Sequence, residues 1–149
     1  MGKRKFWAVL SIVFLFFCSA CGNELKDEDV TISVIRHGKE YTKNVDTGLL
    51  ELLESIVSEE CKAPRMLSLF LPLSEVEKYK EDGIYIEVVY KNGKVFPMME
   101  DSSDIVIDEV HFLIREEPSN CYVCCDTETA YYTFFLSGDA CDKISKYLN

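Results

Sequence analysis

The chain has 149 residues, with 16 lysines and arginines against 26 aspartates and glutamates, and a formal net charge of −10 at pH 7. This acidic balance excludes nucleic acid as an expected partner, because the phosphate backbone is bound by basic surfaces. The length fits one domain of ordinary size and leaves no room for a second.

The first 21 residues have the pattern of an export signal. Residues 3–5 are basic, and the apolar segment 6–17 follows them. This segment is shorter than the ~18 residues needed to span a membrane, so we expect cleavage and not permanent insertion. Ser19 and Ala20 supply the small residues that a signal peptidase requires before its cut.

The segment Cys18-Ser19-Ala20-Cys21 resembles the lipobox of bacterial lipoproteins, in which a cysteine receives diacylglycerol and becomes the mature N-terminus. The class usually has leucine where this chain has Cys18. The resemblance covers residues 1–21 and implies lipidation of Cys21 and anchoring to the cell membrane or outer membrane, on the extracytoplasmic side. The alternative is ordinary secretion, because Cys18-Ser19-Ala20 also satisfies the small-x-small rule and Cys21 would then carry no lipid.

This interpretation divides the chain into a signal peptide (1–20), a lipidated cysteine with a polar tether (21–29) and a single globular domain (30–149). Cleavage before Cys21 leaves 129 of the 149 residues and removes three basic residues and no acid, so the formal charge becomes −13. A tether this short keeps the domain, and any partner, close to the membrane surface.

The first half of the domain predicts one strand and one helix. Apolar residues alternate over 30–36, which is typical of a strand. The period then changes, and the leucines and isoleucine of 49–57 fall on one helical face. Asp46 or Thr47 is available to cap this amphipathic helix, and Cys61 lies near its end.

The middle of the domain predicts shorter elements. A strand at 66–71 is bounded by prolines, which favours the edge of a sheet. Ser74 caps a brief helix that stops at Gly83. The next strand begins at Ile84 and is expected to turn back in a hairpin at Asn92-Gly93.

The remaining elements complete the predicted fold. A long strand is expected over 104–115, an aromatic strand over 130–136, and a closing helix capped by Asp139. Together these elements predict an α+β fold with a single mainly antiparallel or mixed sheet. The amphipathic helix and the C-terminal helix pack on one face of it, and we expect the brief helix on that face as well.

Cysteines give the domain its one unusual chemical feature. They are Cys61, Cys121, Cys124, Cys125 and Cys141. Disulfides are the leading interpretation for an exported domain, for example one member of the 121/124/125 group bonded to Cys61 and another to Cys141. If Cys21 is lipidated, at least one of the five is unpaired, whereas a free Cys21 allows three bridges.

A metal site is the alternative interpretation, because the thiolates of Cys121, Cys124 and Cys125 in a tight turn can share one tetrahedral ion, with Cys141 or a histidine as the remaining ligand. No second CxxC or spaced histidine pair completes a zinc motif. A catalytic Cys121-x-x-Cys124 dithiol is disfavoured, because the acidic residues that follow would raise the pKa of these thiols.

Enzymatic motifs are missing from the sequence, which has no nucleophile elbow, phosphate loop or zinc-protease helix. Glu109 and His111 share a strand face and suit an acid–base pair, although a solvated stripe is the more common meaning of this spacing. We expect no enzyme and no cofactor.

The expected function is a lipid-anchored extracytoplasmic domain that binds or contacts something at the membrane surface. Its expected partners are the membrane, through the lipid on Cys21, and a protein or envelope component. The alternative is a metal-handling lipoprotein that uses Cys121, Cys124, Cys125 and Cys141.

Overall fold

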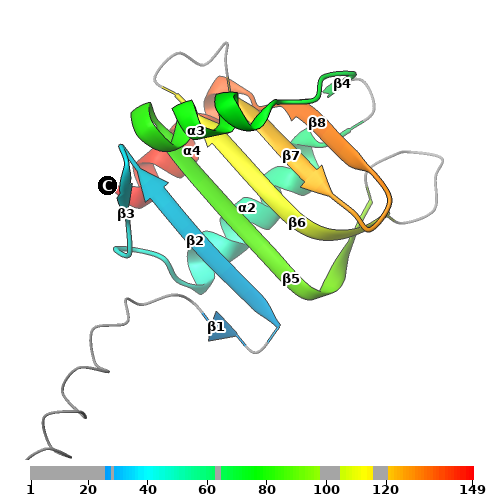
Figure 1. The fold of residues 1–149 in the computed structure, drawn as a ribbon. Helices are drawn as coiled ribbons and strands as arrows, with labels where there is room; N and C mark the ends of the chain where they lie inside the picture. Colours follow the sequence, from blue (N-terminus) through cyan, green and yellow to red (C-terminus); the bar gives the residue numbers. More distant parts are fainter. Residues whose placement is uncertain (1–25, 28, 63–64, 98–104, 116–120) are drawn as a thin grey trace, which may run out of the picture.

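One antiparallel sheet forms the centre of the molecule (Figure 1). The computed structural model describes residues 26–27, 29–62, 65–97, 105–115 and 121–149. The strands are β1 (Lys26–Asp27), β2 (Val30–Arg36), β3 (Lys39–Glu40), β4 (Met66–Leu67), β5 (Ile84–Phe96), β6 (Ile105–Ile114), β7 (Tyr122–Asp126) and β8 (Tyr131–Phe135). Their order in space is β1-β2-β5-β6-β7-β8-β4, and β3 pairs with β2 outside this path.

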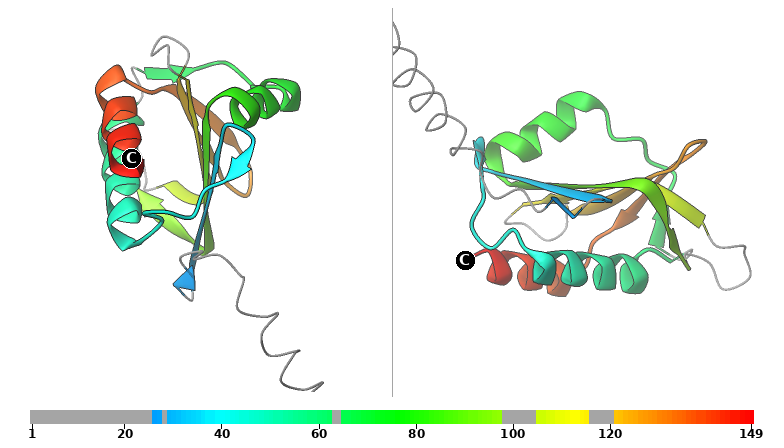
Figure 2. Two further views of the ribbon diagram at one scale, coloured as in Figure 1. Left: turned by 90° about the vertical axis from the view of Figure 1, so that its left-hand side faces the viewer. Right: turned by 90° about the horizontal axis from the view of Figure 1, so that it is seen from below.

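Two helices, α2 (Thr47–Glu60) and α4 (Gly138–Leu148), lie side by side on one face of the sheet (Figure 2). This arrangement confirms the predicted α+β fold. Asp46 caps α2, as predicted, with Oδ1 accepting a hydrogen bond from the Leu49 N–H at 3.0 Å. The predicted cap of α4 is wrong: Ser137, and not Asp139, accepts from a helical N–H. Asp139 lies inside the first turn, where its charge favours the helix dipole.

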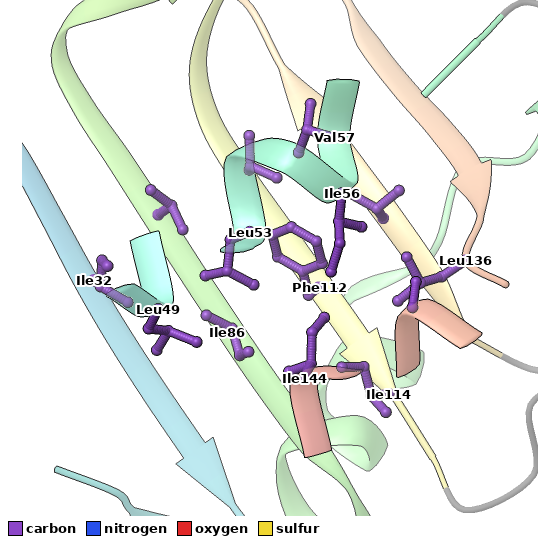
Figure 3. Close-up of a cluster of buried hydrophobic side chains, with 14 of the residues drawn as sticks. Ile32, Leu49, Leu53, Ile56, Val57, Ile86, Phe112, Ile114, Leu136 and Ile144 are labelled. Atoms are coloured by element: carbon purple, nitrogen blue, oxygen red, sulfur yellow. The ribbon is translucent and has the colours of Figure 1, made fainter. Parts of the chain in front are cut away.

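The main core fills the space between these helices and the sheet (Figure 3). Leu53 and Ile56 project from α2 and Ile144 from α4, and they meet Ile86 and Phe112 of the central strands. All five side chains are at most 2% exposed. Burial of such a side chain contributes about 1.5–3 kcal/mol, so this layer is the main source of stability.

The third helix, α3 (Leu73–Asp82), lies on the opposite face of the sheet (Figure 2). The expectation that all helices share one face is therefore wrong. Tyr79 of α3 is buried in a second, smaller cluster with Tyr85 and Leu113 of the sheet. Strand alternation explains this cluster, because Tyr85 and Leu113 point away from the main core. α3 follows Pro72, which provides no side-chain cap, so Ser74 is not the cap.

β5 runs from Ile84 to Phe96 without a turn, so the hairpin predicted at Asn92-Gly93 is wrong. Gly93 adopts a φ of +69°, whereas Asn92 is not among the residues with positive φ. The pairing of β5 with β6 shifts register between Val89 and Lys94. One left-handed residue produces a bulge, whereas a type I′ turn needs two.

The other predicted strands have mixed outcomes. The strands at 30–36, 104–115 and 130–136 are confirmed as β2, β6 and β8. The strand predicted at 66–71 is shortened to the two residues of β4, at the sheet edge. The cysteine segment that was expected to form a tight turn is instead β7.

The end of α4 is tied to the loop that precedes α2. The Tyr147 hydroxyl donates to Asp46 Oδ1 at 2.7 Å, and the Asn44 side-chain amide donates to the Tyr147 carbonyl at 3.0 Å. Segments more than 100 residues apart in the chain are thereby fixed to each other.

Truncation of a buried side chain in the main core should destabilise the fold. We expect Phe112→Ala to lower the free energy of unfolding by about 3–5 kcal/mol, because a fully buried ring leaves a cavity. Val106→Ala, on the same strand but 50% exposed, is the control and should change stability by less than about 0.5 kcal/mol. Urea denaturation followed by circular dichroism measures both. Equal losses would contradict this assignment of the core.

Candidate functional site

A row of side chains, here named the polar row, crosses the sheet on the face that carries α3. Its members are Ser33, Glu87, His111, Cys124 and Thr133, each the cross-strand partner of the next. Such partners project to the same side of a sheet with Cβ atoms about 5 Å apart. α3 covers only one end of this face, over β2, β5 and β6 (Figure 1), and His111 lies at the centre of the row.

His111 makes the densest set of polar contacts in the row. Its Nδ1 lies 2.9 Å from the Tyr85 hydroxyl, and that hydroxyl donates to Glu87 Oε1 at 3.2 Å. Its Nε2 lies 3.4 Å from Oε2 of Glu109. We refer to Tyr85, Glu87, Glu109 and His111 as the His111 cluster.

The single proton of the Tyr85 phenol can be donated to only one of its two neighbours, Glu87 Oε1 or His111 Nδ1. Burial raises the pKa of Tyr85 well above its ordinary value, so the hydroxyl stays protonated. When that proton is donated to Glu87, Nδ1–H of His111 donates to the phenol oxygen and Nε2 presents its lone pair to the Glu109 carboxylate. Two acceptors that face each other in this tautomer are stabilised by a proton or a cation between them. In the other tautomer the phenol donates to Nδ1, and Nε2–H faces Glu109.

The cluster has the composition of a cation site. Glu87, Glu109 and His111 each offer a ligand atom, and these atoms lie within 4.8 Å of one another. Among the described residues, no other group of three or more histidine, cysteine, aspartate and glutamate side chains meets this condition. An imidazole with two carboxylates suits Zn²⁺ and related divalent transition metals.

Four of the five domain cysteines form two close pairs on the helix-covered face. Cys61 ends α2, and its Sγ lies 3.9 Å from Sγ of Cys125 in β7. Cys121, directly before β7, shares a hydrogen bond with Cys141 of α4. All four side chains are buried. The predicted partners for Cys61 and Cys141 are therefore adjacent to them, and all five sulfurs are present as thiols.

Cys124 lies apart from these pairs, on the opposite face of the sheet. Its thiol donates to Thr133 Oγ1 at 3.8 Å, and burial raises its pKa to about 11. Successive residues of a strand point to opposite faces, so Cys124 cannot join Cys121, Cys125 and Cys141 around one ion. The structure thus does not assemble the predicted four-cysteine metal site.

The local prediction for Cys121 also needs correction. Acidic neighbours were expected to raise the pKa of this thiol, but the structure lowers it to about 7. The main cause is the hydrogen bond from Cys141, and the Arg115 backbone N–H also donates to Cys121 Sγ, at 3.4 Å. Cys121 and Cys124 face opposite sides of the sheet, so the dithiol geometry of a redox enzyme is not formed.

The N-terminal predictions fall mostly outside the described residues. Cys21 and the whole signal segment lie there, and lipidation stays a prediction. The predicted tether (21–29) is shorter than expected, because β1 pairs with β2 and so begins the sheet within it.

Sequence reasoning identified only part of the His111 cluster. The spacing of Glu109 and His111 was visible, whereas Tyr85 and Glu87 were not selected. The alternation of residues in the strand from Ile84 does place Tyr85 and Glu87 on the same face. The sequence does not show the register between strands, which places Glu87 opposite His111.

Comparison with models of protein families, with curated proteins and with solved structures finds no match to this chain. Within the described ranges, no helix has the length and apolar character needed to cross a bilayer.

The lowered pKa of Cys121 can be measured directly. In the reduced protein, we expect one thiolate absorbance step centred near pH 7, because the Cys141 S–H stabilises the Cys121 thiolate. Ultraviolet titration records it. Cys141→Ala should move the step to higher pH, since the donor is lost, whereas Cys61→Ala should leave it in place. A step that is unchanged in Cys141→Ala would contradict the assigned cause.

Proposed function

We propose that the protein is a non-catalytic, lipid-anchored extracytoplasmic domain that binds a divalent transition-metal ion, Zn²⁺ or a close relative, on its open sheet face. His111, Glu109 and Glu87 would hold the ion. Support for the location comes from the signal-like first 21 residues, and support for the ligand comes from the His111 cluster.

One distance carries the metal assignment. Nε2 of His111 and Oε2 of Glu109 are 3.4 Å apart. Two ligands of a tetrahedral zinc ion, each about 2.0–2.1 Å from the metal, are separated by about 3.4 Å. The two acceptors are therefore spaced to share one ion without movement of the strands. A cation there also relieves the contact between their lone pairs.

The remaining contacts prepare His111 as a ligand. In the metal-bound form His111 would carry its proton on Nδ1 and donate it to the Tyr85 hydroxyl, which would hold the ring with Nε2 toward Glu109. Metal-bound histidines commonly donate their second N–H to such an orienting group. Glu87 and Glu109 are partly exposed, with 36% and 42% of their side chains accessible, so an ion can enter from solvent. A fourth position is left for water or for a donor atom of a partner.

Contact with a protein or envelope partner is a second candidate function. Exposed apolar side chains gather between β4 and the start of α3, where Phe70 is 73% exposed and Leu73, the first residue of α3, is 79% exposed. The Phe70 ring packs on Tyr131, with centroids 5.6 Å apart. Exposed apolar surface of this kind is typical of interaction sites.

The metal proposal predicts selective loss of binding. We expect His111→Ala to weaken Zn²⁺ binding by on the order of 100-fold, because the nitrogen ligand is removed. Isothermal titration calorimetry with Zn²⁺ on the reduced protein measures this. Binding should also weaken on acidification, since protons compete for Nε2.

His37→Asn is the matched control. His37 is the other histidine and is exposed, with a φ of +50° that asparagine tolerates, so Zn²⁺ affinity should not change. Co²⁺ distinguishes the ligand types, because thiolates give an intense charge-transfer absorption that imidazole and carboxylate do not. Equal binding by wild type and His111→Ala, or a thiolate spectrum with Co²⁺, would refute the proposal.

The anchor has its own test. Protein isolated from its native host membrane should have an intact mass that corresponds to cleavage before Cys21 plus a diacylglycerol-sized increment. Cys21→Ser should abolish the increment and release the protein from the membrane fraction, whereas Cys18→Ser should keep both. A mature mass without lipid would indicate the secreted alternative.

A further inference from the structure

We infer that the protein forms two disulfides, Cys61–Cys125 and Cys121–Cys141, which bond α2 and α4 to β7 and leave Cys124 as a thiol. The inference is independent of the metal site, since none of these four sulfurs belongs to the His111 cluster. It selects one pairing from all those that the sequence permits.

The first pair is held in place by backbone structure on both sides. The Cys61 N–H donates to the Val57 carbonyl at 3.0 Å, which fixes Cys61 at the end of α2. Cys125 is paired with Val110 on one side and Tyr132 on the other. Both residues are at most 1% exposed, and their Sγ atoms are 3.9 Å apart. Rotation of the two side chains can reduce this to the bond length of about 2.05 Å.

The second pair is fixed in the same way and is chemically activated. The Leu136 N–H donates to the Cys121 carbonyl at 3.0 Å, and the Cys141 N–H donates to the Ser137 carbonyl at 3.0 Å. The two thiols are hydrogen-bonded to each other, and the pKa of Cys121 is lowered to about 7. A thiolate is therefore available at neutral pH, and it is the thiolate that attacks a disulfide.

Cys124 is excluded from both bonds by the geometry of β7. It packs with Tyr79, Tyr85 and Leu113 on the α3 side of the sheet, away from the other four sulfurs. A bond to Cys61 or Cys141 would require β7 to turn over, which would bury Asp126 in the main core.

Each bond forms by thiol–disulfide exchange with an oxidant disulfide, either a small molecule such as oxidised glutathione or a protein. One thiolate attacks a sulfur of the oxidant, forms a mixed disulfide and expels the other oxidant sulfur as a thiolate. The second cysteine of the pair then attacks the mixed disulfide and expels the remaining oxidant thiolate. Two protein thiols are oxidised, the oxidant takes up two electrons, and the two protons end on its released thiols.

Peptide mapping tests the connectivity. The full chain, purified in detergent, is equilibrated with oxidised glutathione, alkylated and digested without reduction. Chymotrypsin cuts after Tyr122 and so separates Cys121 from the adjacent Cys124 and Cys125. We expect fragments that join Cys121 to Cys141 and Cys61 to Cys125, with the alkyl group on Cys124. Alkylation of all five domain cysteines, or any bond that contains Cys124, would overturn the inference.

Thermal stability provides a second readout that is internally controlled. Each bond should raise the melting temperature of oxidised over reduced protein by about 10 °C, given typical disulfide stabilisation in a domain of this size. Cys124→Ala should keep the whole difference, whereas Cys125→Ala and Cys141→Ala should each lose about half. Because the oxidised and reduced forms of the same variant are compared, any loss of stability that the substitution itself causes affects both melting temperatures equally. A full difference in all three variants would also refute the pairing.

Discussion

Strict two-residue alternation in the central strands is the constraint on which the rest of the molecule depends. Residues 84–89 of β5 each face a defined residue of β6, and residues 109–113 of β6 each face a defined residue of β7, so a shift by one position would exchange the two faces. The face toward α2 and α4 receives Ile86, Phe112 and Cys125, all of which are fully buried. The other face receives Glu87, His111 and Cys124, and it is covered by helix only at one end.

Two kinds of chemistry are thereby kept apart by the thickness of one sheet. The paired sulfurs lie inside the apolar layer, where the thiols of Cys61 and Cys141 lie next to those of Cys125 and Cys121. The imidazole and carboxylates lie on the other side, where Glu87 and Glu109 are partly exposed to solvent. His111 and Cys124 are direct cross-strand neighbours on that side, yet Cys124 is fully buried and engaged with Thr133. Its sulfur therefore contributes to packing, while the ring beside it remains available to a ligand.

The sequence predicts periodic elements well and pairing poorly. The alternation at 30–36 and the helical face at 49–57 are local signals, and both elements form where expected. The hairpin at Asn92-Gly93 fails because long-range pairing with β6 continues past the local turn signal. β7 was not predicted, because its cysteines were interpreted as disulfide partners or metal ligands in a tight turn. Only Glu109 and His111 of the His111 cluster could be predicted together, because they are two residues apart on one strand. Tyr85 and Glu87 come from another strand, and the pairing register brings them close to His111.

The docking of α4 has a consequence for when this domain can fold. α4 is the last element along the chain, yet Ile144 and Leu148 are fully buried in the main core, and Tyr147 bonds to the start of α2. A chain that emerges N-terminus first, from a ribosome or through a membrane pore, cannot close this core until α4 is free. Contacts between such distant segments also make folding slow. The domain therefore completes its main core only after the residues of α4 have emerged.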